Sequence, residues 1–331
     1  MNRLMSKTLM AVVAAGLIAQ PVSAETSVVV LGTLGGSLSN AVAINNRGQV
    51  VGFSPTAAGR DRSFLWEDGT MIDLGTLGGF DSSLATDIND RGQVVGFTTP
   101  FTGDNAGAAF LWEDGAMTDL GTLGGSMGQA IGINNRGQVA GFSTTASGDG
   151  HAFLWQGGTM TDLGTLGGPL SEAFAINDRG QVVGASTPAA GDLHAFLWQD
   201  GVMTDLGTLG GSFSAASDIN ARGQVVGQSQ TASSRFNSHA FLWQSGTMTD
   251  LGTLGGSISA AFGINDRGQI VGVSTTTSGD GHAFLWQSGV MTDLGTLGGS
   301  FSAASDVNAL GQVVGTNSTA GVENIAVMWT K

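Results

Sequence analysis

Short apolar stretches recur along the chain from residue 28 onward, and each is bounded by Gly, Asn, Asp or Ser. In one representative segment they cover residues 129–133, 138–143, 151–155 and 160–166. Runs of this length, separated by turn residues, are typical of β-strands. No window after residue 24 keeps an apolar period of 3.6 residues, so we expect few or no helices. The pattern therefore predicts an all-β protein.

The turns between these candidate strands are of two kinds. The first and second strands are joined by sequences such as Asn134-Asn135-Arg136-Gly137, where Asn can bond its own backbone and Gly accepts a positive φ. The third and fourth strands are joined by pairs such as Asp200-Gly201, which favour a type I′ hairpin. Both turns predict antiparallel pairing.

The candidate strands belong to a repeat that fills the chain. The string LGTLGG occurs seven times at spacings of 43 to 46 residues, beginning at Leu31, Leu74, Leu120, Leu163, Leu206, Leu251 and Leu294. One tryptophan falls at the same point of every copy: Trp66, Trp112, Trp155, Trp198, Trp243, Trp286 and Trp329. Four strands in a repeat of this length match one blade of a β-propeller.

The two ends of the chain complement each other. Val28–Leu31 reads as a fourth strand without its hairpin partner, and Ile325–Trp329 reads as a third strand without its successor. We therefore expect one domain, residues 25–331, forming a seven-bladed β-propeller with four antiparallel strands per blade, closed by pairing of the N- and C-terminal strands. An open β-solenoid is the alternative, although it would need atypical end units. The sequence leaves open which segment crosses between blades, Gly-Gly-Ser after LGTL or the longer loop after GQVVG.

Residues 1–24 have the features of a secretory signal peptide. Arg3 and Lys7 precede an apolar run from Leu9 to Ala19, and small residues lie at Val22-Ser23-Ala24. The run is too short for a membrane span, and an uncleaved anchor is the less favoured alternative. We expect an exported protein, extracellular or periplasmic, whose mature chain has no membrane anchor and is a monomer.

The amino-acid composition limits the kinds of partner and activity that can be expected. The chain has 12 basic and 26 acidic residues, and its arginines are scattered singly, so nucleic acid is not an expected partner. There is no cysteine and no tyrosine, which excludes disulfides, a cysteine nucleophile and a tyrosine-dependent sialidase. The aromatic Phe-x-Trp positions are interpreted as core, so that Trp155→Ala is expected to cost on the order of 3–5 kcal/mol.

The repeat resembles the bacterial extracellular HAF family, named after a recurrent His-Ala-Phe. Four copies carry that tripeptide, starting at His151, His194, His239 and His282, whereas the other three diverge at the same position. The resemblance covers the whole mature chain. It implies export and a surface or extracellular setting, and no general activity.

An acidic residue lies two positions before three of these histidines, at Asp149, Asp192 and Asp280. His and carboxylate are proper ligands for zinc and its neighbours. Equivalent positions on successive blades would, however, lie about 10 Å apart, the spacing of packed sheets. We therefore expect a local Asp–His hydrogen bond at the strand entry, with neither a metal nor another cofactor.

Six copies place an aspartate before LGTLGG: Asp73, Asp119, Asp162, Asp205, Asp250 and Asp293. Paired carboxylates can hydrolyse glycosides, but these aspartates follow the repeat, and a catalytic site would break it. We expect them to form hydrogen bonds in turns or between blades. A secreted hydrolase or lyase acting on glycans remains the alternative function, and no catalytic residue can be assigned.

The repeat varies most between GQVVG and tryptophan, where 14 residues separate the two in five copies and 16 in two. Because strands alternate in direction, these loops and the Gly-Gly junctions should emerge on one face. Variable loops on a rigid scaffold often carry recognition, so we expect a scaffold that binds a protein or carbohydrate there. The candidate contacts are Asp104, Asn105, Asp149, His151, Asp192, His194, Arg235, Phe236, His239, Asp280 and His282.

Overall fold

The computed structural model describes residues 27–99, 107–232, 234–321 and 324–330. These residues form 28 strands, which pair as repeated sets of four antiparallel strands, here called units. The described part contains no helix, and accordingly none that could span a membrane. The all-β prediction is confirmed, while the signal segment, residues 1–24, lies outside the described residues.

The strands of each unit follow one another in the chain. The first strands are β2 (Asn40–Ile44), β6 (Ser82–Ile88), β10 (Gly124–Ile133), β14 (Gly167–Ile176), β18 (Gly210–Ile219), β22 (Gly255–Ile264) and β26 (Gly298–Val307). The second strands are β3 (Val50–Pro55), β7 (Val94–Thr99), β11 (Val139–Thr145), β15 (Val182–Pro188), β19 (Val225–Thr231), β23 (Ile270–Thr276) and β27 (Val313–Thr319).

The third strands are β4 (Asp61–Glu67), β8 (Ala108–Glu113), β12 (Gly150–Gln156), β16 (His194–Gln199), β20 (Ser234–Gln244), β24 (Gly281–Gln287) and β28 (Ile325–Thr330). The fourth strands are β5 (Thr70–Asp73), β9 (Ala116–Asp119), β13 (Thr159–Asp162), β17 (Val202–Asp205), β21 (Thr247–Asp250), β25 (Val290–Asp293) and, beside β28, β1 (Ser27–Val30).

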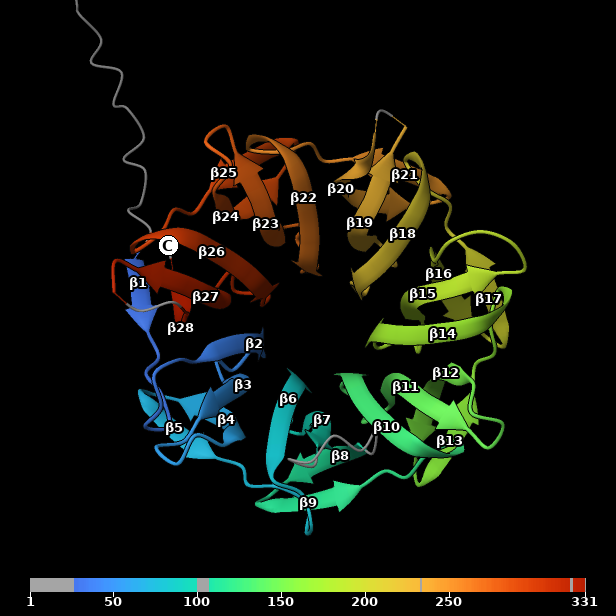
Figure 1. Cartoon of the computed structure of the whole chain (residues 1–331), viewed down its shortest axis with the longest axis horizontal. Helices are drawn as coiled ribbons and strands as arrows, with labels where there is room; N and C mark the ends of the chain where they lie inside the picture. The colour runs from blue at the N-terminus through green and yellow to red at the C-terminus, as the bar shows by residue number, and fades with distance from the viewer. Residues whose placement is uncertain (1–26, 100–106, 233, 322–323, 331) are drawn as a thin grey trace, which may run out of the picture.

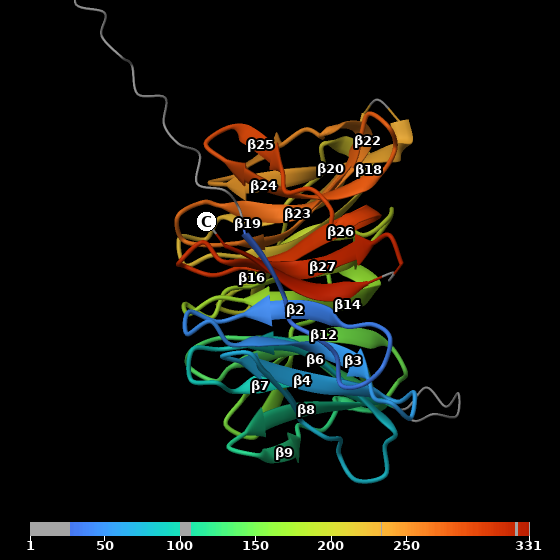
Figure 2. The same cartoon turned by 90° about the vertical axis from the view of Figure 1, so that its left-hand side faces the viewer.

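The units surround a central axis, with the first strand of each unit innermost (Figure 1). Seen edge-on, the strands run across the thickness of the molecule between two faces (Figure 2). One face holds the connections from second to third strand and the passages between units, and we call it the loop face. The other holds the connections from first to second and third to fourth strand, and we call it the turn face.

The first and last described strands lie side by side (Figure 1). β1 pairs antiparallel with β28, with Val28 opposite Trp329 and Val30 opposite Val327. The first unit also contacts the last, because the backbone N–H of Ile44 donates to the Asp306 carboxylate over 2.9 Å.

Both predicted turn types are confirmed. In the third-to-fourth connection, Asp200 and Gly201 have φ angles of 51° and 86°, as a type I′ turn requires. In the first-to-second connection, the Asn134 side-chain oxygen accepts the N–H groups of Arg136 and Gln138, each over 3.0 Å. Turn chemistry therefore fixes both kinds of hairpin.

The asparagine of that turn also joins neighbouring units, which its sequence position did not reveal. Asn134 Nδ2 donates to Gln138 Oε1 over 2.7 Å and to the backbone carbonyl of Asn177, in the next unit, over 3.0 Å. The same contact to the next turn is made by Asn45, Asn89, Asn177, Asn220, Asn265 and Asn308. All four hydrogen-bonding positions of this buried amide are thus satisfied.

The structure corrects the expected strand boundaries and resolves the crossing between units. The fourth strand ends at Asp162 rather than at Leu166, because the LGT segment leaves the sheet. The Gly-Gly pair instead opens the next inner strand, which begins at Gly167. The chain therefore crosses between units through LGTL, not through the loop after GQVVG.

The core lies between consecutive units rather than within one. The cluster between the second and third units combines Val95 and Ala109 with Ile133 and Phe153. The phenylalanine of the third strand is fully buried in six units: Phe64, Phe110, Phe153, Phe196, Phe241 and Phe284. Trp155 is only partly buried and packs against the same cluster. The aromatic positions are core residues as predicted, with phenylalanine the more deeply buried of the two.

Each inner strand contains one extra residue near its end, a β-bulge. In β2, Ala41 pairs with Gly52 and Ala43 with Val51, so that Val42 has no partner. The same register shift recurs in β6, β10, β14, β18, β22 and β26. A bulge bends the strand and re-aims its side chains, and here it lies on the central axis.

Candidate functional site

The loops between second and third strands lie on the loop face, together with the passages between units. In the third unit, Leu123 of the passage bridges to Thr145 at the start of the loop, and the loop itself spans only residues 146–149. Backbone hydrogen bonds from Thr145 to Asp149 and from Gly148 to Thr145 close it tightly. The loops are therefore shorter than expected, because the strands extend into the predicted variable segments.

One of the two longer segments differs from its expected form. β20 begins at Ser234, and Thr231 pairs with Ser234, so the two extra residues extend the hairpin instead of lengthening a loop. The backbone of Arg235 and Phe236 lies in this strand, whereas their side chains lie outside the described part. Asp104 and Asn105, in the other long segment, also lie outside the described residues.

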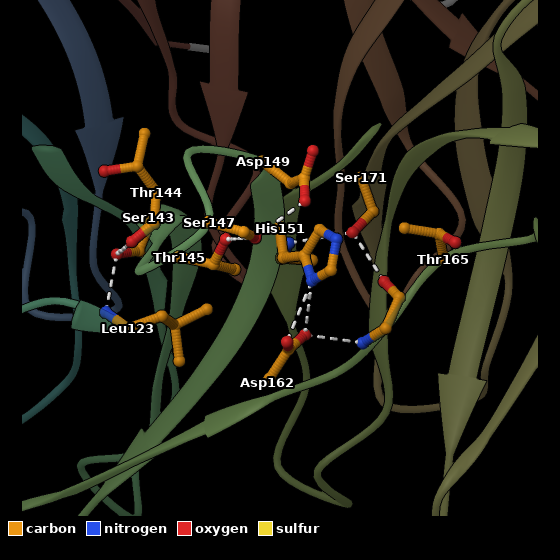
Figure 3. Close-up of polar contacts among 12 residues, drawn as sticks. Leu123, Ser143, Thr144, Thr145, Ser147, Asp149, His151, Asp162, Thr165 and Ser171 are labelled. Carbon is orange, nitrogen blue, oxygen red and sulfur yellow. Dashed lines mark hydrogen bonds and ion pairs between the residues drawn. The ribbon is translucent and has the colours of Figure 1, made fainter. Parts of the chain in front are cut away.

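The four histidines are each paired with a carboxylate on the loop face, and Figure 3 shows the first pair. His151 Nδ1 lies 2.8 Å from Asp162 Oδ2. The equivalent distances are 2.7 Å for His194–Asp205 and 2.8 Å for both His239–Asp250 and His282–Asp293. The histidine side chains are 20 to 24% exposed.

The expected partner of these histidines was wrong. Asp149, two residues before His151, accepts a hydrogen bond from Ser147 Oγ over 2.7 Å, and the equivalent Asp280 accepts one from Ser278. Asp192 accepts one from Ser212 Oγ over 2.5 Å. The hydrogen-bond partner of histidine is instead the aspartate before LGTLGG, which reaches it across the hairpin of the third and fourth strands.

The same aspartates also have the turn role predicted for them. Asp162 Oδ1 accepts the backbone N–H of Gly164 over 2.8 Å, and the equivalent bond forms at Asp73, Asp119, Asp205, Asp250 and Asp293. The carboxylate therefore fixes the start of the passage between units and orients the histidine ring.

The buried serine near the His151–Asp162 pair does not complete a catalytic triad. Ser171 Oγ accepts the N–H of Ala152 over 2.9 Å and donates to the carbonyl of Gly164 over 2.6 Å (Figure 3). A triad serine must instead bond to histidine. Ser171 joins two units, and this pair has no nucleophile among its described partners.

The inner strands surround a hollow of about 440 Å³ on the central axis, which the sequence did not reveal. Its walls include the bulged residue of every inner strand and, in five units, the residue that follows it. In three units these are a hydroxyl and a carboxylate: Thr86-Asp87, Ser217-Asp218 and Ser305-Asp306. In the other four, an apolar residue precedes Ala or Gly: Val42-Ala43, Ile131-Gly132, Phe174-Ala175 and Phe262-Gly263. The repeat is therefore asymmetric at the hollow.

Each of the three carboxylates holds two backbone N–H groups. Asp218 Oδ1 accepts the N–H of Ile219 over 2.7 Å, and Asp218 Oδ2 accepts that of Ile264 in the next unit over 2.8 Å. Asp87 and Asp306 make the equivalent pairs of bonds. These aspartates therefore join neighbouring inner strands and are held in fixed orientations.

The carboxylates are recessed in the hollow and repel one another. Burial raises the pKa of Asp218 to about 7, and repulsion by Asp306 and Asp266 adds to this rise, while the bonds from Ile264 and Ile219 oppose it. Burial and the other two carboxylates raise the pKa of Asp87 well above its ordinary value. Burial also raises the pKa of Asp306. Perturbed acids in a hollow are typical of functional sites, although structural networks also produce them.

A signal in the sequence could have located these residues. They stand two positions before the turn asparagine, where the other four copies hold Gly or Ala. An aspartate at a position that holds a small residue in the other copies departs from the repeat. Departures of that kind mark copies that have a function of their own within a repetitive scaffold.

A second, smaller hollow of about 210 Å³ lies on the axis at the turn face. It is lined by the turn asparagines and the Ile or Val before each of them. Its carboxylates serve the turns, since the N–H groups of Asn46, Asn135 and Ala221 donate to Asp90, Asp178 and Asp266 over 2.8 to 2.9 Å. The contacts between units therefore account for the polar residues that line this second hollow.

No three His, Asp or Glu side chains of the described residues are arranged to hold one metal ion. The two axial hollows thus contain carboxylates that are spread around the ring instead of converging on a point.

Comparison with known proteins supports the architecture alone. No family model and no curated protein matches the sequence. The structure is similar to the β-propeller domain of the Trilobed protease from Pyrococcus furiosus, described as having an open velcro topology, with 10% identity, a TM-score of 0.59 and coverage of 88% of this chain and 95% of that one.

Two peptidases are similar over about half of their own length. A puromycin-hydrolyzing peptidase of Mycobacterium tuberculosis matches with 10% identity, a TM-score of 0.54 and coverage of 91% of this chain and 54% of that one. The acylaminoacyl peptidase of Pyrococcus horikoshii matches with 10% identity, a TM-score of 0.51 and coverage of 88% and 51%. At this identity the likeness concerns fold only, and it shows that the chain is a β-propeller.

Proposed function

We propose that the protein is an exported, seven-bladed β-propeller of the HAF type, closed by pairing of β1 with β28, which binds a protein or glycan ligand on its loop face without catalysis. The mature chain would be an extracellular or periplasmic monomer. A propeller by itself implies no function, so the proposal depends on the two faces and their side chains.

Three contacts between the chain ends support closure. They are the ladder from Val28–Trp329 to Val30–Val327, the bond from Asn308 to the carbonyl of Asn45, and the bond from Ile44 to Asp306. The ladder repeats the pairing of third and fourth strands found within the other units. The two bonds repeat contacts that consecutive units make elsewhere. The first and last units are thus related to each other as any two neighbours are.

The observation that carries the binding proposal is the contrast between the faces. On the turn face, every unit repeats an Asn-led turn with the same hydrogen bonds. On the loop face, the loops differ in amino-acid sequence from copy to copy, for example at residues 56–60, 146–149 and 189–193. A scaffold whose turns have the same sequence on one face and whose loops differ in sequence on the other is suited to ligand recognition by those loops.

The His–Asp pairs give this face a second property. They occupy four consecutive units, with His151 on β12, His194 on β16, His239 on β20 and His282 on β24. Because Nδ1 is bound to carboxylate, Nε2 is the ring nitrogen left to meet a ligand. A row of equivalent polar groups suits a ligand whose own chemistry repeats, and this favours a polysaccharide over a single small molecule.

One observation favours an enzyme instead, namely that the carboxylates of the axial hollow are arranged asymmetrically among the units. Their oxygens are, however, held by backbone N–H groups, and the His151–Asp162 pair has no nucleophile beside it. Binding without turnover is therefore the function that the geometry supports best.

The test uses the mature chain and a panel of soluble polysaccharides, assayed both for binding and for new reducing ends or unsaturated uronate absorbance. We expect saturable binding of at least one polysaccharide and no turnover. Turnover would establish the enzyme instead, and neither binding nor turnover would leave protein ligands, to be sought by pull-down from culture supernatant.

Loop variants locate the site. Replacing residues 102–107 and 233–238 with the Ser147–Gly150 sequence should weaken binding roughly tenfold, corresponding to about 1.4 kcal/mol, without loss of fold. The matched control replaces turn-face residues, Asp200→Asn together with Val202→Thr, and should bind like the parent. Unchanged affinity in the doubly swapped variant would place the ligand elsewhere.

A further inference from the structure

We propose that the axial hollow is a separate binding site for a small aliphatic diamine or triamine, an organic cation whose ammonium groups are spaced along an apolar chain. This inference goes beyond the proposed loop-face function and does not depend on it. Three features of the hollow support this inference. They are its size, the acidic groups at separate points of its wall, and the aromatic side chains and unbonded polar side chains that line it.

The hollow has the dimensions of a ligand pocket. Its volume of about 440 Å³ falls within the roughly 300–1,000 Å³ of typical small-molecule sites. Apolar and aromatic side chains from four units cover much of its wall: Val42, Ile131, Phe174 and Phe262. Phe262 is 38% exposed there. A ligand with an apolar chain would cover these side chains.

The charge of the hollow is of one sign. Asp87, Asp218 and Asp306 line it, whereas none of its lining residues is Lys or Arg. Asp266, at the turn face, adds a further negative charge that acts on Asp218. A cation is therefore the ligand charge that complements this site.

Several polar groups in the hollow lack a partner. Among the described residues, no hydrogen bond is formed by the side-chain hydroxyls of Ser217 and Ser305 or by the side-chain amide of Gln228, although all three line the hollow. By contrast, Thr86 Oγ1 donates to the carbonyl of Ala130 over 2.9 Å. The unpaired groups offer oxygen acceptors, and an ammonium group supplies three donors and accepts none.

The distribution of the carboxylates distinguishes an amine from a metal ion. They come from three units, and the described acidic side chains do not converge on one point that could hold a metal. A linear oligoamine instead places separate charges at separate carboxylates. Its methylene groups would lie against Ile131 and Phe174, and an ammonium group near Phe262 would gain a cation–π contact.

The direct test is calorimetric titration of the mature protein with 1,5-diaminopentane at pH 8.0 and pH 5.5, in low salt. We expect saturable binding with a dissociation constant below about 1 mM at pH 8.0. Because burial raises the pKa of the hollow carboxyls, protons compete with the amine, and affinity should fall roughly tenfold at pH 5.5. Pentane-1,5-diol, which lacks the charges, should not bind.

Two variants and a control separate the hollow from general surface attraction. Asp218→Asn should weaken diamine binding about tenfold, and Phe262→Ala about threefold, within the range expected for a cation–π contact. Asp200→Asn makes the same charge change on an exposed turn-face hairpin and should leave affinity unchanged. Phe262→Ala keeps the test valid if Asp218→Asn does not fold, because the partly exposed ring contributes less to the core.

The proposal is overturned by any of four results: absence of saturable binding, equal binding of the diol, equal affinity in both hollow variants and the parent, or exclusion of the diamine by calcium chloride, which would assign the hollow to a metal ion. Polysaccharide binding on the loop face is measured separately, so failure of one proposal is distinguishable from failure of the other.

Discussion

The side-chain amide of Asn308 donates a hydrogen bond of 3.1 Å to the backbone carbonyl of Asn45, 263 residues earlier in the chain. Consecutive turns elsewhere are joined by the same bond at 2.9 to 3.2 Å. A contact made between neighbours throughout the chain is thus also made between its two ends.

This relationship predicts that Asn308→Ala and Asn177→Ala destabilise the protein equally. Both remove an amide that accepts two backbone N–H groups and bonds to the next turn, so each should lower the free energy of unfolding by roughly 2–4 kcal/mol. Urea denaturation followed by circular dichroism measures the two values. If Asn308→Ala cost less than half as much, the end units would not be joined as the others are.

Deletion of residues 27–34 tests closure more severely. It removes β1, exposing the edge of β28 and the apolar side chains against which Val28 packs. An unpaired apolar edge promotes aggregation, so we expect poor solubility and a melting temperature lower by about 10 °C or more. Deletion of Lys331 is the control and should change neither. A shortened protein that melts with the parent would contradict closure.

Stability should fall as pH rises from about 4 to about 7. Burial raises the pKa of Asp218 to about 7 and that of Asp87 and Asp306 above the ordinary value. In this interval the unfolded chain has released protons that the folded protein retains, so each step upward favours unfolding. The free energy of unfolding should be lower at pH 8 than at pH 5 by on the order of 2 kcal/mol.

Urea titrations at several pH values check this dependence, and Asp218→Asn should flatten it. The variant keeps one oxygen to accept a backbone N–H but cannot ionise. Asp200→Asn, at an exposed turn, should leave the profile of the parent intact. A parent more stable at pH 8 than at pH 5 would show that the hollow carboxyls are not the dominant titrating groups.

The two aromatic positions of the third strand should contribute unequally to the free energy of unfolding. Phe153 is fully buried between units, whereas Trp155 is only partly buried, so Phe153→Ala should cost about 3–5 kcal/mol and Trp155→Ala less. This revises the larger cost expected for Trp155 from sequence. Equilibrium unfolding of both variants measures the order, and a greater loss for Trp155→Ala would reverse it.

The histidine–aspartate pairs should contribute to polysaccharide binding but contribute little to stability. His151 and Asp162 are both partly exposed, and exposed pairs contribute at most about 1 kcal/mol. We expect His151→Ala together with His194→Ala to lower affinity severalfold while the melting temperature changes by only a few degrees. Arg91→Ala, on the turn face, serves as control. A double variant that binds like the parent would argue against the histidine row.

The strands and hairpins could be predicted because their causes are local. Turns such as Asn134–Gly137 and Asp200-Gly201 carry their conformation in two to four residues, and repetition makes the pattern unmistakable. The end of the fourth strand was misplaced because LGTL is apolar like a strand, although its side chains pack between units after the backbone has left the sheet.

The partner of His151 was missed for a different reason. The hairpin places Trp155 opposite Met160 and Phe153 opposite Asp162, so His151 is the diagonal neighbour of Asp162 on the same face. Counting along the hairpin would have given this partner, whereas proximity in sequence suggested Asp149. The axial hollow could not be found in this way, because Asp87, Asp218 and Asp306 meet only when distant units surround one axis.

The bulge in every inner strand gives the hollow a capacity for change. A residue such as Val42 has no partner across the ladder, so it can be exchanged without disturbing the pairing of its neighbours. A protein built from repeated segments thus gains seven variable positions around one axis. Mutation can recombine them into many linings, and new specificities can arise there while the repeat that builds the walls stays the same.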